Sequence, residues 1–419
     1  MKLLISTRSN QNIPFKKIFL FIVSLIIISA CAPSKRFTEY KESENRDFTR
    51  EVRILLNDLT DDISLGTDSY LISSNEKLAL IKSGNKFSAE AIHNEIFIKL
   101  GPKKFNSKEF YLQAVDDSLL ILNNKKFRGR IKLINIDGAI KIINQISLED
   151  YIKGVMTKEM PVGKGNENYE ALKAFAIAAR TYAINKVFGS KTYYDLLPDI
   201  RDQVYGGADA EHPLSNLAVD ETEGLILTFN DEPATVFYHS TCGGYTESAV
   251  NVFTKDDLSY LSTISDGNSA YCSISPNFNW TEIIPESLLI KRLFDARLIN
   301  NINCSIDKFI IKSRFQSGRI NELEISLQCN DERKSISIFG NQIRSIIKNK
   351  TGNGLLKSNN FIIEIDENRN IVITGKGSGH GVGLCQWGAI GQSRLGRNYI
   401  EILNHYYPGT EIKKLNDQN

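Results

Sequence analysis

The clearest hydrophobic pattern lies in residues 147–188, where apolar side chains recur at helical spacing and predict two helices joined by a short loop. Ser147 can cap the first helix, and Pro161 ends it because a residue before proline is disfavoured in helical geometry. Glu159 falls on the apolar face at the helix end, so we expect its carboxyl to have a raised pKa and to carry a proton at neutral pH. The alternative that spacing alone leaves open is a solvated glutamate beside Lys158.

The second helix begins after Asn168, which can cap it, and it carries six alanines between Ala171 and Ala183. Such a stripe of small residues predicts close packing against another backbone. Arg180 lies at the flank of the buried stripe, an unfavourable place for a charge unless it has an anionic partner. A surface arginine whose stem covers apolar residues is the alternative.

Before this helical segment, short apolar runs are broken by Asn, Asp, Gly and Ser and predict strands. After it, strands are expected around 224–229 and 235–239, joined by the turn residues Asn230 and Asp231, and a helix is expected near 398–406. The fold class is therefore α+β, with a β-rich N-terminal part, a two-helix segment that carries the glutamate, and a mixed remainder that closes with a glycine-rich strand and a helix. The expected organisation is a signal peptide (1–30), a tether (31–49), the β-rich part (50–146), a catalytic core (147–280), a subdomain or insertion (281–370) and a glycine-rich C-terminal part of the core (371–412).

Glycine occupies every second position from Gly375 to Gly383. Neither a dinucleotide-binding nor a P-loop spacing occurs there, so the pattern favours a strand with one side free of side chains, which a ligand can approach closely. His380, Gln386 and Trp387 would stand beside this surface, and a polar loop at 192–212 is also suited to carbohydrate. The net charge of +2 and the lack of a long basic run argue against a nucleic-acid partner.

The N-terminus predicts export. A basic region is followed by an apolar run at 18–28 that is short for a membrane span and ends in Ile28-Ser29-Ala30-Cys31, which resembles a lipobox. By that resemblance Cys31 is lipidated and anchors the chain to a membrane of the cell envelope, at the outer membrane or the periplasmic face in a Gram-negative host. An ordinary signal peptide or an uncleaved anchor is the alternative.

Export makes disulfides possible among the five cysteines that follow Cys31. Cys304 and Cys329 flank a predicted strand pair and can form a bridge. His239, Cys242 and Cys272 could supply three ligands of a structural zinc site. The sequence does not decide which residue is the fourth ligand, and the candidates are His212, Cys385 and His380. A Cys242–Cys272 disulfide, with His239 lining the site, is the competing interpretation.

Several motifs, in order, resemble the SpoIID/LytB domain family. They are Leu148-Glu149-Asp150-Tyr151, Lys158-Glu159-Met160-Pro161, Ala171-Leu172-Lys173-Ala174, Ala178-Ala179-Arg180-Thr181-Tyr182-Ala183, Gln203-Val204-Tyr205-Gly206-Gly207, Tyr238-His239-Ser240-Thr241-Cys242-Gly243-Gly244, Gly379-His380-Gly381-Val382-Gly383 and Gln386-Trp387-Gly388-Ala389. The resemblance covers residues 50–410 and is weakest near 281–370.

This resemblance implies peptidoglycan glycan strands as substrate and, as in the sporulation members of the family, lytic transglycosylase activity that leaves a 1,6-anhydro sugar. The catalytic glutamate of the family corresponds to Glu159. No cofactor is required for this reaction, and relatives that bind zinc do so through His and Cys near the His239–Gly244 segment. Other relatives enhance a separate cell-wall amidase, so a glycan-binding protein with an amidase partner is the alternative function.

The chemistry agrees with the resemblance. Hydrolytic glycosidases use two carboxylates, whereas one acid/base suffices when the sugar's own 6-hydroxyl is the nucleophile. Candidates to bind the glycan or support Glu159 are Arg180, Tyr182, Gln203, Tyr205, His239, Ser240, His380 and Gln386. A zinc hydrolase centred on His239 and Cys242 is a third and weaker hypothesis.

Overall fold

The computed structural model describes residues 51–58, 62–190, 192–256, 258–330 and 332–415. The predicted signal peptide, Cys31 and the tether lie outside these residues. Within them the protein is a mixed α+β fold with a β-rich N-terminal region, as the sequence predicts, and these described residues contain seven α-helices. No helix of the described residues combines the length and the apolar character needed to span a membrane.

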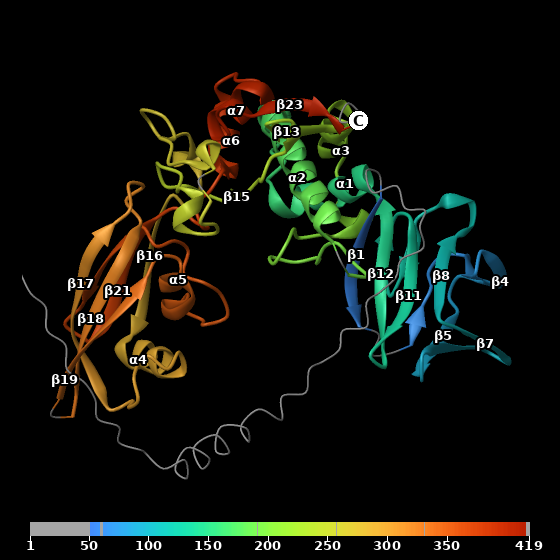
Figure 1. The fold of residues 1–419 in the computed structure, drawn as a ribbon, viewed down its shortest axis with the longest axis horizontal. Coiled ribbons are helices and arrows are strands. Elements are labelled where there is room, and N and C mark those ends of the chain that lie inside the picture. The colour runs from blue at the N-terminus through green and yellow to red at the C-terminus, as the bar shows by residue number, and fades with distance from the viewer. Residues whose placement is uncertain (1–50, 59–61, 191, 257, 331, 416–419) are drawn as a thin grey trace, which may run out of the picture. The chain divides into compact units, whose positions relative to one another are not determined.

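The N-terminal region contains two antiparallel sheets and a short hairpin (Figure 1). The larger sheet has, in spatial order, β1 (Glu51–Asp58), β12 (Ala139–Ser147), β11 (Arg130–Ile136), β8 (Glu109–Ala114), β3 (Ser69–Ser73) and β4 (Glu76–Ile81). The smaller sheet has β2 (Ile63–Ser64), β5 (Lys86–Ile92), β6 (Glu95–Leu100) and β7 (Lys103–Ser107), and the hairpin has β9 (Leu120–Leu122) and β10 (Lys125–Phe127). Asp137 and Gly138 form the tight turn between β11 and β12, and both have positive φ, as such hairpins require.

Strand β12 runs directly into helix α1 (Leu148–Glu159), which begins and ends as predicted. The N-cap Ser147 accepts a hydrogen bond from the Asp150 backbone N–H at 3.1 Å. After a short loop comes α2 (Tyr169–Gly189), and α3 (Pro213–Glu221) packs against both helices. All six alanines of α2 are fully buried, which confirms the close packing that the alanine stripe predicts.

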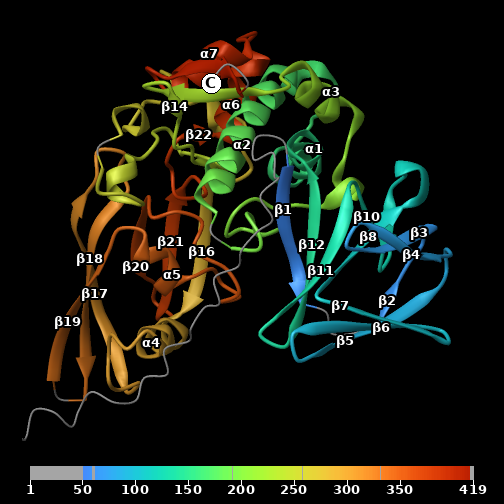
Figure 2. The ribbon, with the colours of Figure 1, turned by 45° about the vertical axis from the view of Figure 1, so that its right-hand side comes forward.

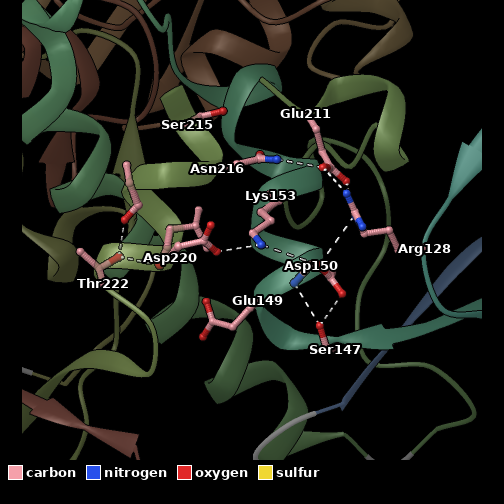
Figure 3. Close-up of polar contacts among 12 residues, drawn as sticks. Arg128, Ser147, Glu149, Asp150, Lys153, Glu211, Ser215, Asn216, Asp220 and Thr222 are labelled. Carbon is pink, nitrogen blue, oxygen red and sulfur yellow. Dashed lines mark hydrogen bonds and ion pairs between the residues drawn. The ribbon is translucent and has the colours of Figure 1, made fainter. Parts of the chain in front are cut away.

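Polar contacts on the outer face of α1 hold it in place (Figure 3). Lys153 Nζ lies 2.8 Å from Asp220 Oδ1 of α3. Arg128, which precedes β11, lies 2.6 Å from Glu211 and 3.8 Å from Asp150. These contacts join α1 to the N-terminal sheet on one side and to α3 on the other.

The rest of the main core contains short strands and two helices. A three-stranded sheet has the order β14 (Glu232–Pro233), β13 (Leu225–Phe229) and β23 (Glu411–Lys414), and the predicted Asn230-Asp231 turn joins its first two strands. Strand β15 (Tyr238–His239) is shorter than expected and pairs in parallel with β22 (Leu384–Cys385). Helices α6 (Gln386–Arg394) and α7 (Tyr399–Tyr406) follow, the second where the sequence predicts it.

A second hydrophobic core lies within residues 280–373 and is separate from the main one. Figure 2 shows its two three-stranded sheets with helices α4 (Glu286–Asp295) and α5 (Gln342–Ile347). The sheets have the orders β16 (Asn279–Pro285), β21 (Asn370–Lys376), β20 (Phe361–Ile365) and β17 (Cys304–Arg314), β18 (Ile320–Cys329), β19 (Glu332–Phe339). Cys304 and Cys329 form a disulfide at the end of the β17–β18 pair, as the sequence predicts.

Arg180 is the buried charge of helix α2. Its side chain is fully buried and meets the Glu149 carboxylate through two hydrogen bonds, of 2.8 Å to Oε1 and 2.7 Å to Oε2. The guanidinium also donates to the Leu225 carbonyl oxygen at 3.0 Å. Arg180 therefore ties α2 to the first turn of α1 and to strand β13, and the anionic partner that its burial demands is Glu149.

We predict that Arg180→Ala lowers the free energy of unfolding by about 3–5 kcal/mol, because it leaves the Glu149 carboxylate half-buried without its partner. Urea unfolding followed by far-ultraviolet circular dichroism measures the loss. The matched control is Lys291→Ala, which breaks an exposed pair with Asp295 and should change the stability by less than about 0.5 kcal/mol. Equal stabilities of the two variants would contradict the structural role of Arg180.

Candidate active site

Glu159 lies on the wall of a cleft of about 510 Å³. Four segments of the main core line this cleft: the end of α1, the C-terminal half of α2, the loop at 200–204 and the segment from Phe237 to Phe253. Gly379 and His380 come from the glycine-rich segment, and Asn341, Arg344 and Leu355 come from the second core. The cleft therefore lies between the two hydrophobic cores.

The Glu159 carboxyl group is half-buried and accepts two hydrogen bonds. The Val204 backbone N–H donates to Oε1 at 2.7 Å, and the Gln386 side-chain amide is a second donor. Burial raises the pKa of Glu159 above its ordinary value, and the two hydrogen bonds oppose that rise by favouring the ionised form. The structure thus bears out the raised pKa that the apolar position predicts, and the solvated alternative does not hold.

Two neutral histidines stand beside the acid. His239 donates from Nδ1 to the Val382 carbonyl oxygen at 3.1 Å, which leaves Nε2 as a buried acceptor without a partner in the described structure. The Val382 N–H donates to His380 Nδ1, so His380 carries its proton on Nε2. Burial and then the charge of Arg344 lower the pKa of His380 to about 3. Burial also holds the pKa of His239 well below its usual value, so both rings are uncharged at neutral pH.

In the loop after Ile200, neighbouring side chains point to opposite sides. Asp202 and Val204 line the cleft, whereas the Gln203 side chain is fully buried and accepts a hydrogen bond from the Tyr151 hydroxyl at 3.1 Å. Tyr205 faces away from the cleft, and its hydroxyl donates to Asn144 Oδ1 at 2.8 Å. The structure thus gives Gln203 and Tyr205 roles in packing the loop against α1 and β12, not the contact with substrate that the sequence predicts.

Tyr182 is the predicted site residue of helix α2 that does line the cleft. Its hydroxyl donates to Asp202 Oδ1 at 3.0 Å, and Lys186 Nζ contacts the same oxygen at 2.7 Å. The other predicted residue of this helix, Arg180, does not line the cleft because Glu149 and backbone carbonyls surround its guanidinium. Arg180 can affect the site only through the position of α2.

Gln386 begins helix α6 and is buried, with its amide on Glu159. Ser240 is partly exposed, and its hydroxyl lies 3.3 Å from the Thr241 hydroxyl. Its backbone carbonyl accepts from the Trp387 N–H at 3.0 Å. Ser240 therefore holds the start of α6 in place and is not among the residues that line the cleft.

From Gly377 onward the glycine-rich segment is a loop, where the sequence predicts a strand with one bare side, and only its first glycine, Gly375, lies in strand β21. Gly377, Gly379, Gly381 and Gly383 all have positive φ, which a regular strand does not allow. A Cβ on Gly379 would lie 2.7 Å from the His239 Cβ, and one on Gly383 would lie 2.0 Å from the Phe237 carbonyl oxygen. The alternating glycines thus allow this loop to pack tightly against the strand that carries His239. This packing brings His380 and Gln386 to the cleft.

The predicted metal ligands do not all lie at one site. Cys242 and Cys272 are free and buried, with their sulfurs 3.4 Å apart, so the disulfide that competed with a zinc site is not formed in the structure. Cys385, one of the three candidates for a fourth ligand, joins them together with Asp266, and the ligand atoms of these four residues all lie within 4.8 Å of one another. His239 is outside this cluster and lines the cleft instead.

Several residues of the cleft were not predicted. Asp202 directly precedes the predicted residue Gln203, and Lys186 lies one helical turn after the predicted residue Tyr182. The helical spacing between Tyr182 and Lys186 could have indicated that they share a face. Phe253 stacks on Phe237 with ring centroids 4.3 Å apart and is half-exposed on the cleft wall. Arg344 belongs to the second core, and no motif near it signals a place in the site.

Comparison with known proteins identifies two matching family models. The model described as stage II sporulation protein (SpoIID) matches residues 136–229, which contain Glu159. A domain of unknown function (DUF8618) matches residues 273–383, close to the range of the second core.

Three relatives cover most of the chain. An uncharacterized protein of Brachyspira hyodysenteriae is 32% identical over 71% of this chain and 75% of its own length. Stage II sporulation protein D of Bacillus subtilis is 29% identical over 66% of this chain and 77% of its own length. The amidase enhancer of Bacillus subtilis is 28% identical over 62% of this chain, and the match spans 40% of that longer protein.

We predict that Glu159→Gln stabilises the protein at neutral pH. Because burial raises the folded-state pKa of Glu159, the wild-type protein loses stability as the pH rises from the unfolded-state pKa through the folded-state pKa. Glutamine does not ionise and avoids this loss. Thermal unfolding should therefore give the variant a higher midpoint at about pH 7.5, by a few degrees at most, and no advantage near pH 4. A variant less stable than wild type only at the higher pH would contradict the raised pKa.

Proposed function

Because the chain belongs to the SpoIID family, we propose that it is a peptidoglycan lytic transglycosylase. It cleaves the bond between N-acetylmuramic acid and N-acetylglucosamine in glycan strands and leaves a 1,6-anhydro-N-acetylmuramic acid end. The observation that carries this proposal is Glu159, a carboxyl group with a raised pKa on the wall of a cleft of about 510 Å³.

The Glu159 carboxyl group supplies both proton transfers of this reaction. In the protonated form, which its raised pKa favours, it donates a proton to the glycosidic oxygen as the bond to the muramic acid C1 breaks. The resulting carboxylate then accepts the proton of the 6-hydroxyl of the same sugar, and that oxygen forms the new bond to C1. Glu159 thus gives up one proton and regains one, and no water takes part in the reaction.

Asp202 is the second carboxylate among the described residues that line the cleft, and its contacts argue against a hydrolytic mechanism. One oxygen accepts from Tyr182 and contacts Lys186, and the other accepts from the Leu197 backbone N–H at 2.8 Å. A carboxylate held in this way is poorly placed to attack a sugar or to activate water, the two tasks of the second acid in hydrolases. Its contacts instead fix Tyr182 and Lys186 on the cleft wall.

The other walls suit a sugar chain. Phe253 has a half-exposed aromatic ring, and sugar rings stack on aromatic rings through their C–H groups. His380 packs edge-on against Phe253, with ring centroids 4.8 Å apart, and its neutral ring adds no charge beside the acid. The Val204 N–H and the Gln386 amide stabilise Glu159 once it has given up its proton, so they favour the first proton transfer.

The proposed place of action is the cell envelope, with the chain anchored by lipid on Cys31. The lipobox-like sequence before Cys31 supports this, and a tether of polar residues would let the folded part reach the glycan. We predict that Cys31→Ala abolishes incorporation of labelled fatty acid and moves the protein from the membrane fraction to the soluble fraction. Continued labelling of the variant would place the lipid elsewhere.

A second candidate function is supported by one relative, the Bacillus subtilis amidase enhancer. In this alternative the cleft binds glycan without cutting it, and the protein stimulates a cell-wall amidase. The two functions differ in their dependence on Glu159, because an enhancer needs the shape of the cleft and not a proton donor.

We predict that Glu159→Gln slows glycan cleavage by at least about 100-fold, since a positioned general acid or base contributes about that factor or more. Purified full-length protein is incubated with glycan strands, and the products are identified by mass spectrometry. The matched control is Glu332→Gln, which changes an exposed glutamate of β19 and should keep the wild-type rate.

The products separate the hypotheses. Anhydro ends that depend on Glu159 support the transglycosylase, whereas reducing ends would identify a hydrolase. Wild-type protein that binds glycan strands without cleaving them, and that stimulates an amidase equally well as Glu159→Gln, would replace the proposal with the enhancer function.

A further inference from the structure

Four buried ligand side chains meet beside the active-site cleft, on segments that are far apart in the sequence. Cys242 follows β15, Asp266 lies in a loop, Cys272 lies in a short 3₁₀ turn and Cys385 caps helix α6. The three sulfurs and one carboxylate oxygen all lie within 4.8 Å of one another. Burying three thiols around an acidic side chain costs free energy unless a cation or hydrogen bonds compensate.

We infer that Cys242, Asp266, Cys272 and Cys385 form a zinc-binding site. Thiolate sulfur and carboxylate oxygen are zinc ligands, and four of them complete the closed tetrahedral shell that is typical of structural sites. Zinc–sulfur bonds of about 2.3 Å place sulfurs in a tetrahedral shell about 3.8 Å apart. The observed Cys242–Cys272 sulfur distance of 3.4 Å is close to this value. His239 is not a ligand, in contrast to the set that sequence motifs suggest.

Backbone N–H groups already point at the sulfurs. The Cys242 N–H donates to Cys385 Sγ at 3.1 Å, and the Gly388 N–H at the start of α6 donates to the same sulfur at 3.3 Å. The Gly244 N–H donates to Cys242 Sγ at 3.4 Å. Such donors stabilise metal-bound thiolates and fix their orientation. Gly388 is required here, because a Cβ would lie 2.6 Å from an oxygen of Asp266.

The contacts of Asp266, the fourth ligand, and of the nearby Arg319 also support the proposed site. Asp266 accepts from the Tyr406 hydroxyl at 2.7 Å and from the Cys272 N–H at 2.8 Å, so its carboxylate is held in place on both oxygens. Three thiolates and a carboxylate leave a net negative charge around a divalent ion. The fully buried guanidinium of Arg319 offsets part of this charge, since it donates to the Cys242 carbonyl oxygen at 2.9 Å.

A disulfide accounts less well for this cluster. A bond between Cys242 and Cys272 would leave the Cys385 thiol and the Asp266 carboxylate buried together without a cation. The chain does form a disulfide between Cys304 and Cys329, while the three cysteines of the cluster are free.

The site has a structural consequence for the cleft, and this part rests on the proposed function. Cys242 follows His239 by three residues, and Cys385 directly precedes Gln386, whose amide contacts Glu159. One ion bound by both cysteines would lock the β15–β22 pair and the start of α6. It would thereby position His239 and Gln386 beside the acid without taking part in the reaction.

The test is the metal content of the full-length protein, purified without chelator and measured by inductively coupled plasma mass spectrometry. We expect about one zinc per chain for wild type, for Glu159→Gln and for His239→Gln, and at least a tenfold lower content for Cys385→Ser and Asp266→Asn. Zinc loss in His239→Gln equal to that in Cys385→Ser would overturn the ligand set. This readout does not depend on glycan cleavage, so the zinc site and the proposed function can fail separately.

A second measurement uses the wild-type protein, in case the ligand variants do not fold. Iodoacetamide is added to the native chain with and without a strong chelator, and the alkylated peptides are identified by mass spectrometry. We expect Cys242, Cys272 and Cys385 to be labelled only after chelation, together with a lower thermal midpoint. A zinc-free chain that yields a Cys242–Cys272 disulfide peptide without reduction would overturn the proposal.

Discussion

The burial of most of helix α2 is the constraint on which the rest of the structure depends. Helices α1, α3, α6 and α7 and strand β13 all pack against it. Alanines make this close approach possible, but they leave little side-chain volume, so the orientation of the neighbours must come from elsewhere. The Arg180–Glu149 pair supplies it for α1, because a bidentate contact inside the protein fixes both distance and rotation. The position of Glu159 at the far end of α1 follows from that pair.

Local signals in the sequence were sufficient for helices α1 and α7 and for the central acid. The cap at Ser147, the stop at Pro161 and the apolar face of α1 act over a few residues, and the structure has them as predicted. Hairpin turns such as Asn230-Asp231 are equally local. The raised pKa of Glu159 could also be inferred, because it follows from placing a carboxylate on an apolar helical face.

The direction of side chains in loops could not be inferred in the same way. Gln203 and Asp202 are neighbours of similar polarity, and only the path of the backbone decides which one meets the cleft. Arg180 has the charge of a ligand-binding residue, yet its partner is Glu149, thirty-one residues earlier. Contacts between distant segments, such as Cys242 with Cys385 or Arg344 with the main core, leave no pattern of spacing that a single sequence reveals.

The two hydrophobic cores give the cleft a property that neither wall has alone. Glu159 belongs to the main core, whereas Arg344 and Leu355 belong to the second, and the space between them holds the solvent that reaches the carboxyl group. A glycan strand bound in this space, as the proposed function requires, would expel that water. The proton affinity of Glu159 then rises with occupancy, because its hydration falls. Under the proposed function, glycan binding would thus strengthen Glu159 as a proton carrier, and an empty cleft keeps it closer to an ordinary carboxylate.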